Sequence, residues 1–506
     1  MIQFLSSSLA IAAIALWTLP STASLPQPEP LDNIPSASQL ADVNPGDWAF
    51  QALQSLTERY DCIVGYPDGT FRGEQSLSRY EFAAALSACL DRMNEQISAS
   101  TANTVSSEDL TTLSRLQTDF AAELATIRSR ADELEMRTAA LEAQSFSTTT
   151  RLNGEVIFAL TGAGGERKAD GSDESVERNV VLGNRVRLEL TTSFSGDDQL
   201  RMRLQARNIP EFEAATGTQM ANLGFDGSTG SLVELDRLDY ETELGDRALV
   251  VVSLVGGGLG DYVSTVNPLF SGSGDGAIST FGRENPIRRQ GGVPGIGLTY
   301  ELTDDLRLEL GYVASGATDP EVGFSQSPYA AVAQVTLEPV DSARFSLTYV
   351  RSFNGLDTGT GSALARDPFE DNSDAIIANS LGAEASVDIG DHFTLGGRVG
   401  WIQATAKDLD DNPQADILTW AVLLGFPDLA GDGNLLGVIA GHPPRVTHNQ
   451  YGDRESDAAL HLEVFYRLQL NDNIAVTPGV FVILNPENDA SNTPIYVGTV
   501  RTTFSF

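Results

Sequence analysis

Residues 460–470, which read LHLEVFYRLQL, decide the fold class of this chain. Apolar side chains occupy every second position, and His461, Glu463 and Arg467 are among the residues that alternate with them. Successive side chains of a β-strand point to opposite faces of the sheet. The stretch therefore predicts a strand with one apolar face and one largely polar face.

The same alternation recurs from residue 150 to the end, for example at 200–205, 306–312 and 344–349. About sixteen such segments of roughly ten residues can be counted, which is the length that a tilted strand needs to cross a bilayer. Tight turns alternate with long polar loops such as 161–179 and 208–230. Long loops at one end only are typical of outer-membrane barrels. We therefore predict an all-β transmembrane barrel of about sixteen antiparallel strands over residues 150–506.

The C-terminus gives an independent indication of the same fold. Tyr496, Val500, Phe504 and Phe506 share one face of the last predicted strand. A terminal Phe at this place resembles the signal by which the outer-membrane assembly machinery recognises its substrates.

Composition excludes several other classes. The 506 residues carry a net charge of -37, which argues against nucleic acid, because that binding depends on Lys and Arg neutralising phosphates. After the N-terminus, no apolar run is long enough to cross a bilayer as a helix. Residues 1–24 have the apolar core and small residues of a signal peptide, and residues 25–39 are predicted to be a linker.

Residues 40–97 are predicted to form a small helical unit. Asn44-Pro45-Gly46-Asp47 supplies a cap, a proline in the first turn and an early acid. Ser78-Arg79-Tyr80-Glu81 has capping-box spacing before a second apolar stripe of helical period. Export leaves Cys62 and Cys89 free to form a disulfide, and two buried thiols are the alternative that the sequence leaves open.

Four motifs of this unit resemble those of a surface-layer-homology domain, the module that attaches envelope proteins to peptidoglycan-linked polymers: Asp42-Val43, Trp48-Ala49, the GYPDGTFR of residues 65–72, and the SRYEF of residues 78–82. In that family the Arg and Glu of a Thr-Arg-Ala-Glu motif bind the wall polymer. Arg79 and Glu81 match this pair, whereas Ser78 and Tyr80 depart from it. A guanidinium group suits anionic polymer groups, because its fork of donors is rigid and always charged.

The resemblance implies that this unit binds peptidoglycan or a linked wall polysaccharide. The residues assigned to that site are Trp48, Asp68, Arg72, Arg79 and Glu81. The alternative is that Arg79 merely pairs with an acid on a helix surface.

Residues 108–143 are predicted to form a coiled coil. Leu113, Phe120, Ile127 and Leu134 belong to a stripe in which apolar or tolerated residues fall alternately every four and three positions. Surface-layer proteins usually carry three wall-binding units, and one unit per chain becomes three if the coil is a trimer. A homotrimer is therefore expected, and a helix packed back on its own domain is the alternative.

This order of domains resembles the cyanobacterial outer-membrane porins described as carbohydrate-selective porin B-like or iron-uptake porins. The resemblance implies a barrel embedded in outer-membrane lipid, with its N-terminal domain in the periplasm. It also implies passive diffusion of inorganic ions and small hydrophilic solutes, with iron and sugars as candidates. The alternative function is a structural tether between outer membrane and cell wall, with a closed or nearly closed barrel.

A constriction is expected where the fifth and sixth strands are joined by residues 256–292. This connection is long and rich in Gly, and in sixteen-stranded porins the loop at this place folds into the barrel. The alternative is a loop that covers the mouth. The alternation along the second and third predicted strands places their charged side chains on the inward face, opposite this connection. The expected pore-lining residues are Arg185, Arg187, Arg201, Arg203, Asp275, Arg283, Glu284, Arg288 and Arg289.

No catalytic, metal or cofactor site is predicted. Asp408, Asp410 and Asn412 have the opening spacing of a calcium loop, but Pro413 stands where that loop needs Gly. His461 faces the predicted lumen near Glu463, and no nucleophile is identifiable beside them.

Overall fold

The computed structural model describes residues 50, 54 and 149–506. The chain divides into two units, Met1–Glu135 and Met136–Phe506, and nearly all described residues belong to the second. Phe50 and Gln54 are both helical. The predicted signal peptide, linker, surface-layer-homology unit and coiled coil lie outside the described residues, apart from these two positions. The same holds for the cysteines and the five residues assigned to wall binding.

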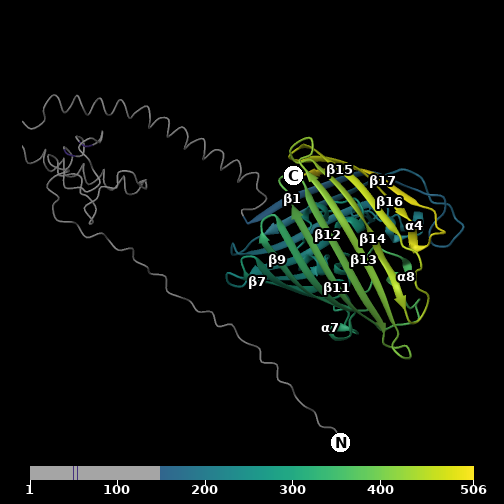
Figure 1. Cartoon of the computed structure of the whole chain (residues 1–506). Coiled ribbons are helices and arrows are strands. Elements are labelled where there is room, and N and C mark those ends of the chain that lie inside the picture. Colours follow the sequence, from purple (N-terminus) through teal and green to yellow (C-terminus); the bar gives the residue numbers. More distant parts are fainter. Residues whose placement is uncertain (1–49, 51–53, 55–148) are drawn as a thin grey trace, which may run out of the picture. The chain divides into compact units, whose positions relative to one another are not determined.

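The second unit is a closed barrel (Figure 1). Its single sheet has seventeen strands among the described residues, of which β4 (Gly227–Ser228) pairs only with the end of β3. The other sixteen form the wall: β1 (Thr150–Gly164), β2 (Val181–Thr192), β3 (Asp198–Ile209), β5 (Glu234–Glu243), β6 (Ala248–Val255), β7 (Gly295–Thr303), β8 (Leu306–Ala314), β9 (Tyr329–Val340), β10 (Ala343–Phe353), β11 (Ile376–Asp388), β12 (Thr394–Ala406), β13 (Gln414–Pro427), β14 (Leu435–Asn449), β15 (Leu460–Asn471), β16 (Ile474–Leu484) and β17 (Ile495–Ser505). Neighbouring strands are antiparallel, and β17 pairs with β1 to close the ring. The prediction of about sixteen antiparallel strands is confirmed.

The alternation read from the sequence sets the two faces of the wall. On β15, the outward Leu462 and Val464 are 38% and 41% exposed, whereas the inward His461 and Glu463 are 0% and 2% exposed. The apolar face therefore points out of the barrel and the polar face points into it. An outward apolar face suits a lipid environment. The closed ring suits it as well, because all the backbone hydrogen-bonding groups of the strands can then be satisfied within the barrel.

Short and long connections alternate along the wall. The β7–β8 connection is residues 304–305 and the β9–β10 connection is 341–342, whereas β6 and β7 are joined by residues 256–294. The first long loop begins later in the chain than predicted. The sequence predicted a loop from Thr161, whereas β1 continues to Gly164. The reason is that its last residues pair with β17, a contact between the two ends of the barrel sequence.

Short helices lie in the long connections: α4 (Glu213–Thr216) and η3 (Gln219–Ala221) before β5, η4 (Leu259–Asp261), α5 (Pro268–Ser271), α6 (Thr280–Arg283) and η5 (Pro286–Arg289) before β7, α7 (Gly323–Gln326) before β9, α8 (Ala363–Arg366) before β11 and η6 (Pro486–Asn488) before β17. Within the described part of the chain, no helix has the length and apolar character needed to cross a membrane.

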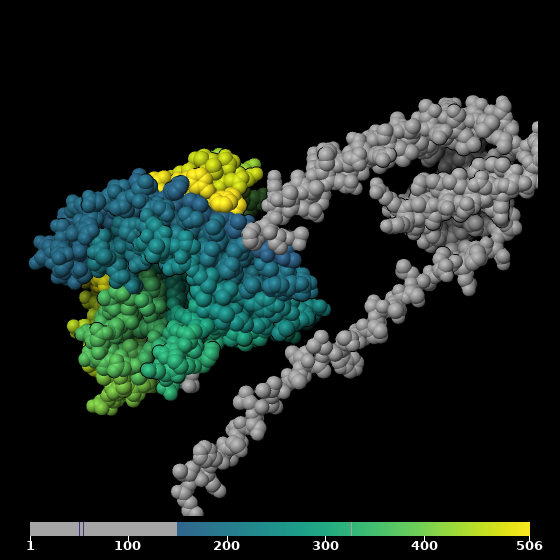
Figure 2. Space-filling view, turned by 180° about the vertical axis from the view of Figure 1, so that it is seen from behind, coloured from purple at the N-terminus to yellow at the C-terminus, as the bar shows by residue number. Residues whose placement is uncertain are grey.

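The hydrophobic core lies inside the barrel. Phe270, Ile278 and Phe281 of the 256–294 connection pack against inward residues of β14 to β17, including Phe465 and Phe481. Residues of the 210–233 connection join the same cluster. The inner face of this part of the wall is thus covered by loops, while the space-filling view shows a hollow between the teal and green segments (Figure 2).

Candidate functional site

The connection of residues 256–294, here called the inner loop, is built from short capped turns. Ser279 begins α6 by accepting a hydrogen bond from the Gly282 amide. Asn285 accepts from the Ile287 amide, and Pro286 follows in the first turn of η5. Such caps satisfy the amide groups at helix starts. These caps fix the local conformation of two turns of the inner loop.

One end of β17 holds the middle of the inner loop. Arg501 donates to the carbonyl oxygens of Ser273 at 2.9 Å and Gly276 at 2.7 Å. Thr503 donates to the Gly274 carbonyl at 2.7 Å, and Arg185 of β2 donates to the Ser273 hydroxyl at 2.8 Å. Four bonds from two strands thus fix this part of the loop against the wall.

A second anchor is a buried group on β15. The Glu463 carboxylate accepts from the Ile278 amide at 2.7 Å and from the Ser279 hydroxyl, and His461 Nε2 lies 3.3 Å from that hydroxyl. The sequence offered no nucleophile near His461, and Ser279 comes from a loop far away in the chain. All three side chains are at most 2% exposed. The group is inaccessible to a substrate, so it fixes the loop.

Further bonds continue around the lumen. Ser264 donates its amide to Glu309 of β8 at 2.7 Å, and Asn285 donates to the Val399 carbonyl of β12 at 3.1 Å. Gln290 donates to Ser380 of β11 and accepts from Ser352 of β10, both at 2.7 Å. The inner loop is therefore bonded to the wall on several sides of the barrel.

The inward side chains of β2, β3 and β5, here called the charged wall, form a network of paired charges. Arg203 contacts Asp236 at 2.5 Å, and Arg187 donates to Gln205 at 2.7 Å. Arg201 lies 3.6 Å from Asp239. The side chains of Arg187, Arg201 and Arg203 keep 20%, 24% and 18% of their surface exposed, so paired charge faces the lumen.

Arg237 joins the charged wall to the inner loop. It contacts Asp239 of its own strand at 2.6 Å and Asp261 of the inner loop at 2.8 Å. Arg207, of the same parity as Arg201 and Arg203, donates to the carbonyl oxygen of Asp226 in the 210–233 connection. The sequence analysis did not include Arg207, Arg237 and their acidic partners among the site residues. The alternation along β3 and β5 could have indicated that Arg207 and Arg237 point inward.

Asp226 lies between the two sides of this site. Its carboxylate accepts from the Leu223 amide at 2.7 Å, and the charges of Arg207 on the wall and Arg289 on the inner loop both act on it. Burial raises the pKa of Asp226 to about 7, and the nearby Glu211 adds to that rise.

The predicted pore-lining residues of the inner loop, together with Arg185 of β2, separate into two groups. Arg283 donates to the carbonyl oxygens of Ser271 and Gly224, and Arg289 pairs with Glu284 at 3.1 Å. Asp275 is mostly exposed and lies 3.6 Å from Arg467 of β15. Arg185 and Arg288, in contrast, are only 1% and 2% exposed. Arg185 pairs with Glu155 of β1, and Arg288 pairs with Glu384 of β11. The first ion pair joins two neighbouring strands, and the second joins the inner loop to the wall.

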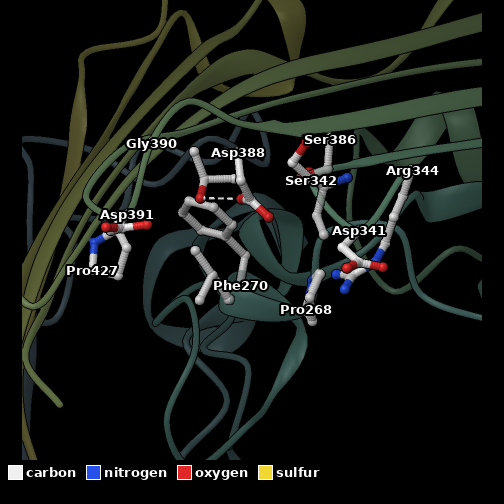
Figure 3. Close-up of a pocket in the computed structure, with 13 residues that line it drawn as sticks. Pro268, Phe270, Asp341, Ser342, Arg344, Ser386, Asp388, Gly390, Asp391 and Pro427 are labelled. Atoms are coloured by element: carbon white, nitrogen blue, oxygen red, sulfur yellow. Dashed lines mark hydrogen bonds between the residues drawn. The ribbon is translucent and has the colours of Figure 1, made fainter. Parts of the chain in front are cut away.

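The inner loop also reaches the end of the barrel that carries the short turns. Pro268 and Phe270 face Asp341, Arg344 and Asp391 across a pocket of about 420 Å³ (Figure 3). Thr394 and Asp388, bonded at 2.6 Å, line the same pocket. Among the described residues, no group of three or more His, Cys, Asp or Glu side chains is arranged to hold a metal ion.

Comparison with known families gives two matches. A family model described as "Carbohydrate-selective porin, OprB family" matches residues 107–506. A second model, "S-layer homology domain", matches residues 39–83.

Similar proteins span nearly the same length. An uncharacterized protein of Nostoc sp. is 40% identical over 504 residues, covering 94% of this chain and 85% of that protein. An uncharacterized protein of Synechocystis sp. is 38% identical over 508 residues, covering 94% of this chain and 92% of that one. Among solved structures, Pseudomonas putida OprB shares the fold with a TM-score of 0.51 at 12% identity, covering 74% of this chain and 97% of that chain.

Proposed function

Because this chain belongs to the carbohydrate-selective porin OprB family, we propose that ions and small hydrophilic solutes, including sugars, cross its barrel between the inner loop and the charged wall. Family membership makes the chain an outer-membrane β-barrel porin, which is a diffusion channel and not an enzyme. The S-layer homology match adds a domain of the class that binds cell-wall polysaccharide.

The observation that supports this route is the placement of the inner loop. The inner loop is hydrogen-bonded to inward side chains of β8, β10, β11, β15 and β17 and to a backbone carbonyl of β12, so it lies inside the lumen. The paired charges of Arg203 and Asp236 on the facing wall stay partly exposed. Charge interactions in a narrow and partly dehydrated passage are stronger than in bulk water.

The pairing itself favours solutes that need both donors and acceptors. Arg203 with Asp236, and Arg237 with Asp261, present guanidinium and carboxylate groups side by side. A hydroxyl-rich neutral solute uses both kinds of group, because each hydroxyl donates and accepts. A row of unpaired arginines would instead select anions.

Planar-bilayer recordings under a salt gradient test the route. Arg201 also lies 3.7 Å from Glu241 of β5. Changing Arg201 and Arg203 to Ala leaves Asp236, Asp239 and Glu241 without these partners, so we expect the reversal potential to shift toward cations. Shortening residues 256–292 should raise single-channel conductance, because the inner loop then occupies less of the lumen.

The control is Arg454→Ala, which removes a charge from an exposed outer connection. No change in reversal potential or conductance in the wall and loop variants would show that neither element lines the narrowest part. A parent protein with no conductance would favour the tether function.

We also propose that the chain is anchored to the cell wall as a trimer. The heptad pattern of residues 108–143 supports association of three chains, and each contributes one wall-binding unit. Arg79 and Glu81 are proposed to contact the wall polymer.

A further inference from the structure

Arg351 of β10 occupies an unusual place on the outer face of the barrel. Val350 and Ser352 are inward and buried, so Arg351 between them points outward, and it is exposed. At the other outward positions of β8, β9 and β10 the residues are apolar or aromatic. A charge on the lipid face is costly at the bilayer centre and tolerated near its interfaces. A role at the membrane interface therefore fits Arg351.

The surroundings of Arg351 place it at that interface. It lies two residues from the end of β10, on the side of the long connections. Tyr312, Tyr329 and Phe353 stack in a row at this end of neighbouring strands, with ring centroids 5.8 and 6.0 Å apart. Rows of outward aromatic side chains mark the boundary between hydrocarbon and headgroups.

Arg351 is held in place by neutral groups. Its guanidinium donates to Asn379 Oδ1 at 3.0 Å, and the Tyr349 hydroxyl donates to the same oxygen at 2.8 Å. The contact orients the guanidinium group and adds no negative charge. A rigid, positively charged fork of donors suits an oxyanion.

An apolar groove begins beside this group and runs along the lipid face. Leu347, Tyr349 and Trp401 form its sides over the small residues Ala333 and Ala383, and its volume is about 540 Å³. A second hollow of about 630 Å³ continues it, since both share Val335, Leu347, Ala383 and Val399. Leu347 is 68% exposed, so this side of the groove projects outward from the barrel wall.

We propose that this surface binds one anionic membrane lipid, whose phosphate or sulfonate headgroup contacts Arg351 and whose acyl chain lies in the groove. The charge of Arg351 matches the headgroup, and the apolar lining matches the chain. The proposal rests on the outer-membrane location of the porin and is independent of the route that solutes take.

The test measures lipid binding to the purified full chain in neutral detergent by native mass spectrometry. Phosphatidylglycerol and phosphatidylcholine serve as the anionic and zwitterionic probes. We expect the first phosphatidylglycerol to bind about tenfold more tightly than phosphatidylcholine, because phosphatidylglycerol carries a net negative charge, whereas the choline cation of phosphatidylcholine opposes the charge of Arg351. Arg351→Ala should remove this preference, and Leu347→Trp, which fills the groove, should weaken both lipids.

Arg344→Ala is the matched control, because Arg344 lies on the same strand and lines the pocket near the inner loop. It should bind phosphatidylglycerol as the parent does, and heat-dependent gel migration checks that each variant is folded. Equal binding of the two lipids by the parent, an unchanged preference in Arg351→Ala, or the same loss in Arg344→Ala would each overturn the proposal.

Discussion

Tyr262 shows how single residues set the inner loop against the wall. Its side chain is 3% exposed and packs over Gly297 of β7 and Gly311 of β8. A Cβ atom built at Gly297 would overlap the Tyr262 ring. Glycine at these wall positions therefore allows the close approach of a large aromatic side chain from the loop.

Replacing Gly297 with Ala should destabilise the folded barrel by about 1 to 3 kcal/mol, because overpacking forces side chains from their preferred positions. Urea unfolding in detergent, followed by tryptophan fluorescence, measures the change. Gly498→Ala is the control, since a Cβ there meets nothing within 4 Å, and its effect should stay within about 0.5 kcal/mol. Equal unfolding midpoints for the two variants would contradict the packing role of Tyr262.

At the scale of elements, the outer connections are joined by a partly buried carboxylate. Glu487 of η6 accepts from the Thr218 hydroxyl in the 210–233 connection and from the Ala363 amide of α8 at 2.6 Å. Arg366 of α8 contacts Glu213 of α4 at 3.0 Å. These contacts join the long connection before β17 to the one before β11, and join both to the 210–233 connection.

These contacts should depend on pH. Burial raises the pKa of Glu487 to about 7, the nearby Glu455 adds to that rise, and Arg366 opposes it. A carboxyl whose pKa is higher in the folded state than in an open one favours the folded state when protonated. The stability of the contact is therefore greatest below the ordinary pKa of 4.5 and falls as pH rises through 7.

Hydrogen exchange of the Ala363 region, corrected for intrinsic rates, should show more opening at pH 8 than at pH 5. Glu487→Gln should abolish this difference, because the amide does not titrate. Glu243→Gln, an exposed position at the other end of the barrel, should leave it intact. A parent protein with the same protection at both pH values would disprove the dependence.

At the scale of the whole molecule, cell-wall binding is expected to depend on the number of chains. One weak unit per chain gains avidity when three are linked, because the second and third binding events become intramolecular. The full chain with Arg79→Ala should bind isolated peptidoglycan sacculi less than the parent in a pull-down. Polar replacements at Leu113, Phe120, Ile127 and Leu134 should lower binding as well and reduce chemical cross-linking between chains.

The two variants separate the wall contact from the association of chains. Arg79→Ala should leave cross-linking unchanged, whereas the heptad variant should show less cross-linking and weaker binding to sacculi. Sacculus binding by Arg79→Ala equal to that of the parent would remove Arg79 from the site. Unchanged cross-linking in the heptad variant would disprove the coiled coil.

The sequence by itself determined the barrel, its approximate number of strands and the face of each strand. These properties depend on a period of two, which is local and visible in stretches such as residues 460–470. It also placed Arg187, Arg201 and Arg203 on the inward face, because the alternation of side chains holds along these stretches, where β2 pairs with β3 without a shift in register.

Only the tertiary structure decided which inward residues stay exposed and which are covered. Ser279 meets His461, and Asp261 meets Arg237, across separations in sequence that carry no periodic signal. Arg185 and Arg288 share the charge and the predicted role of their neighbours, yet the folded inner loop buries both. The physical reason is that parity fixes the direction of a side chain, whereas burial depends on what a distant segment places over it.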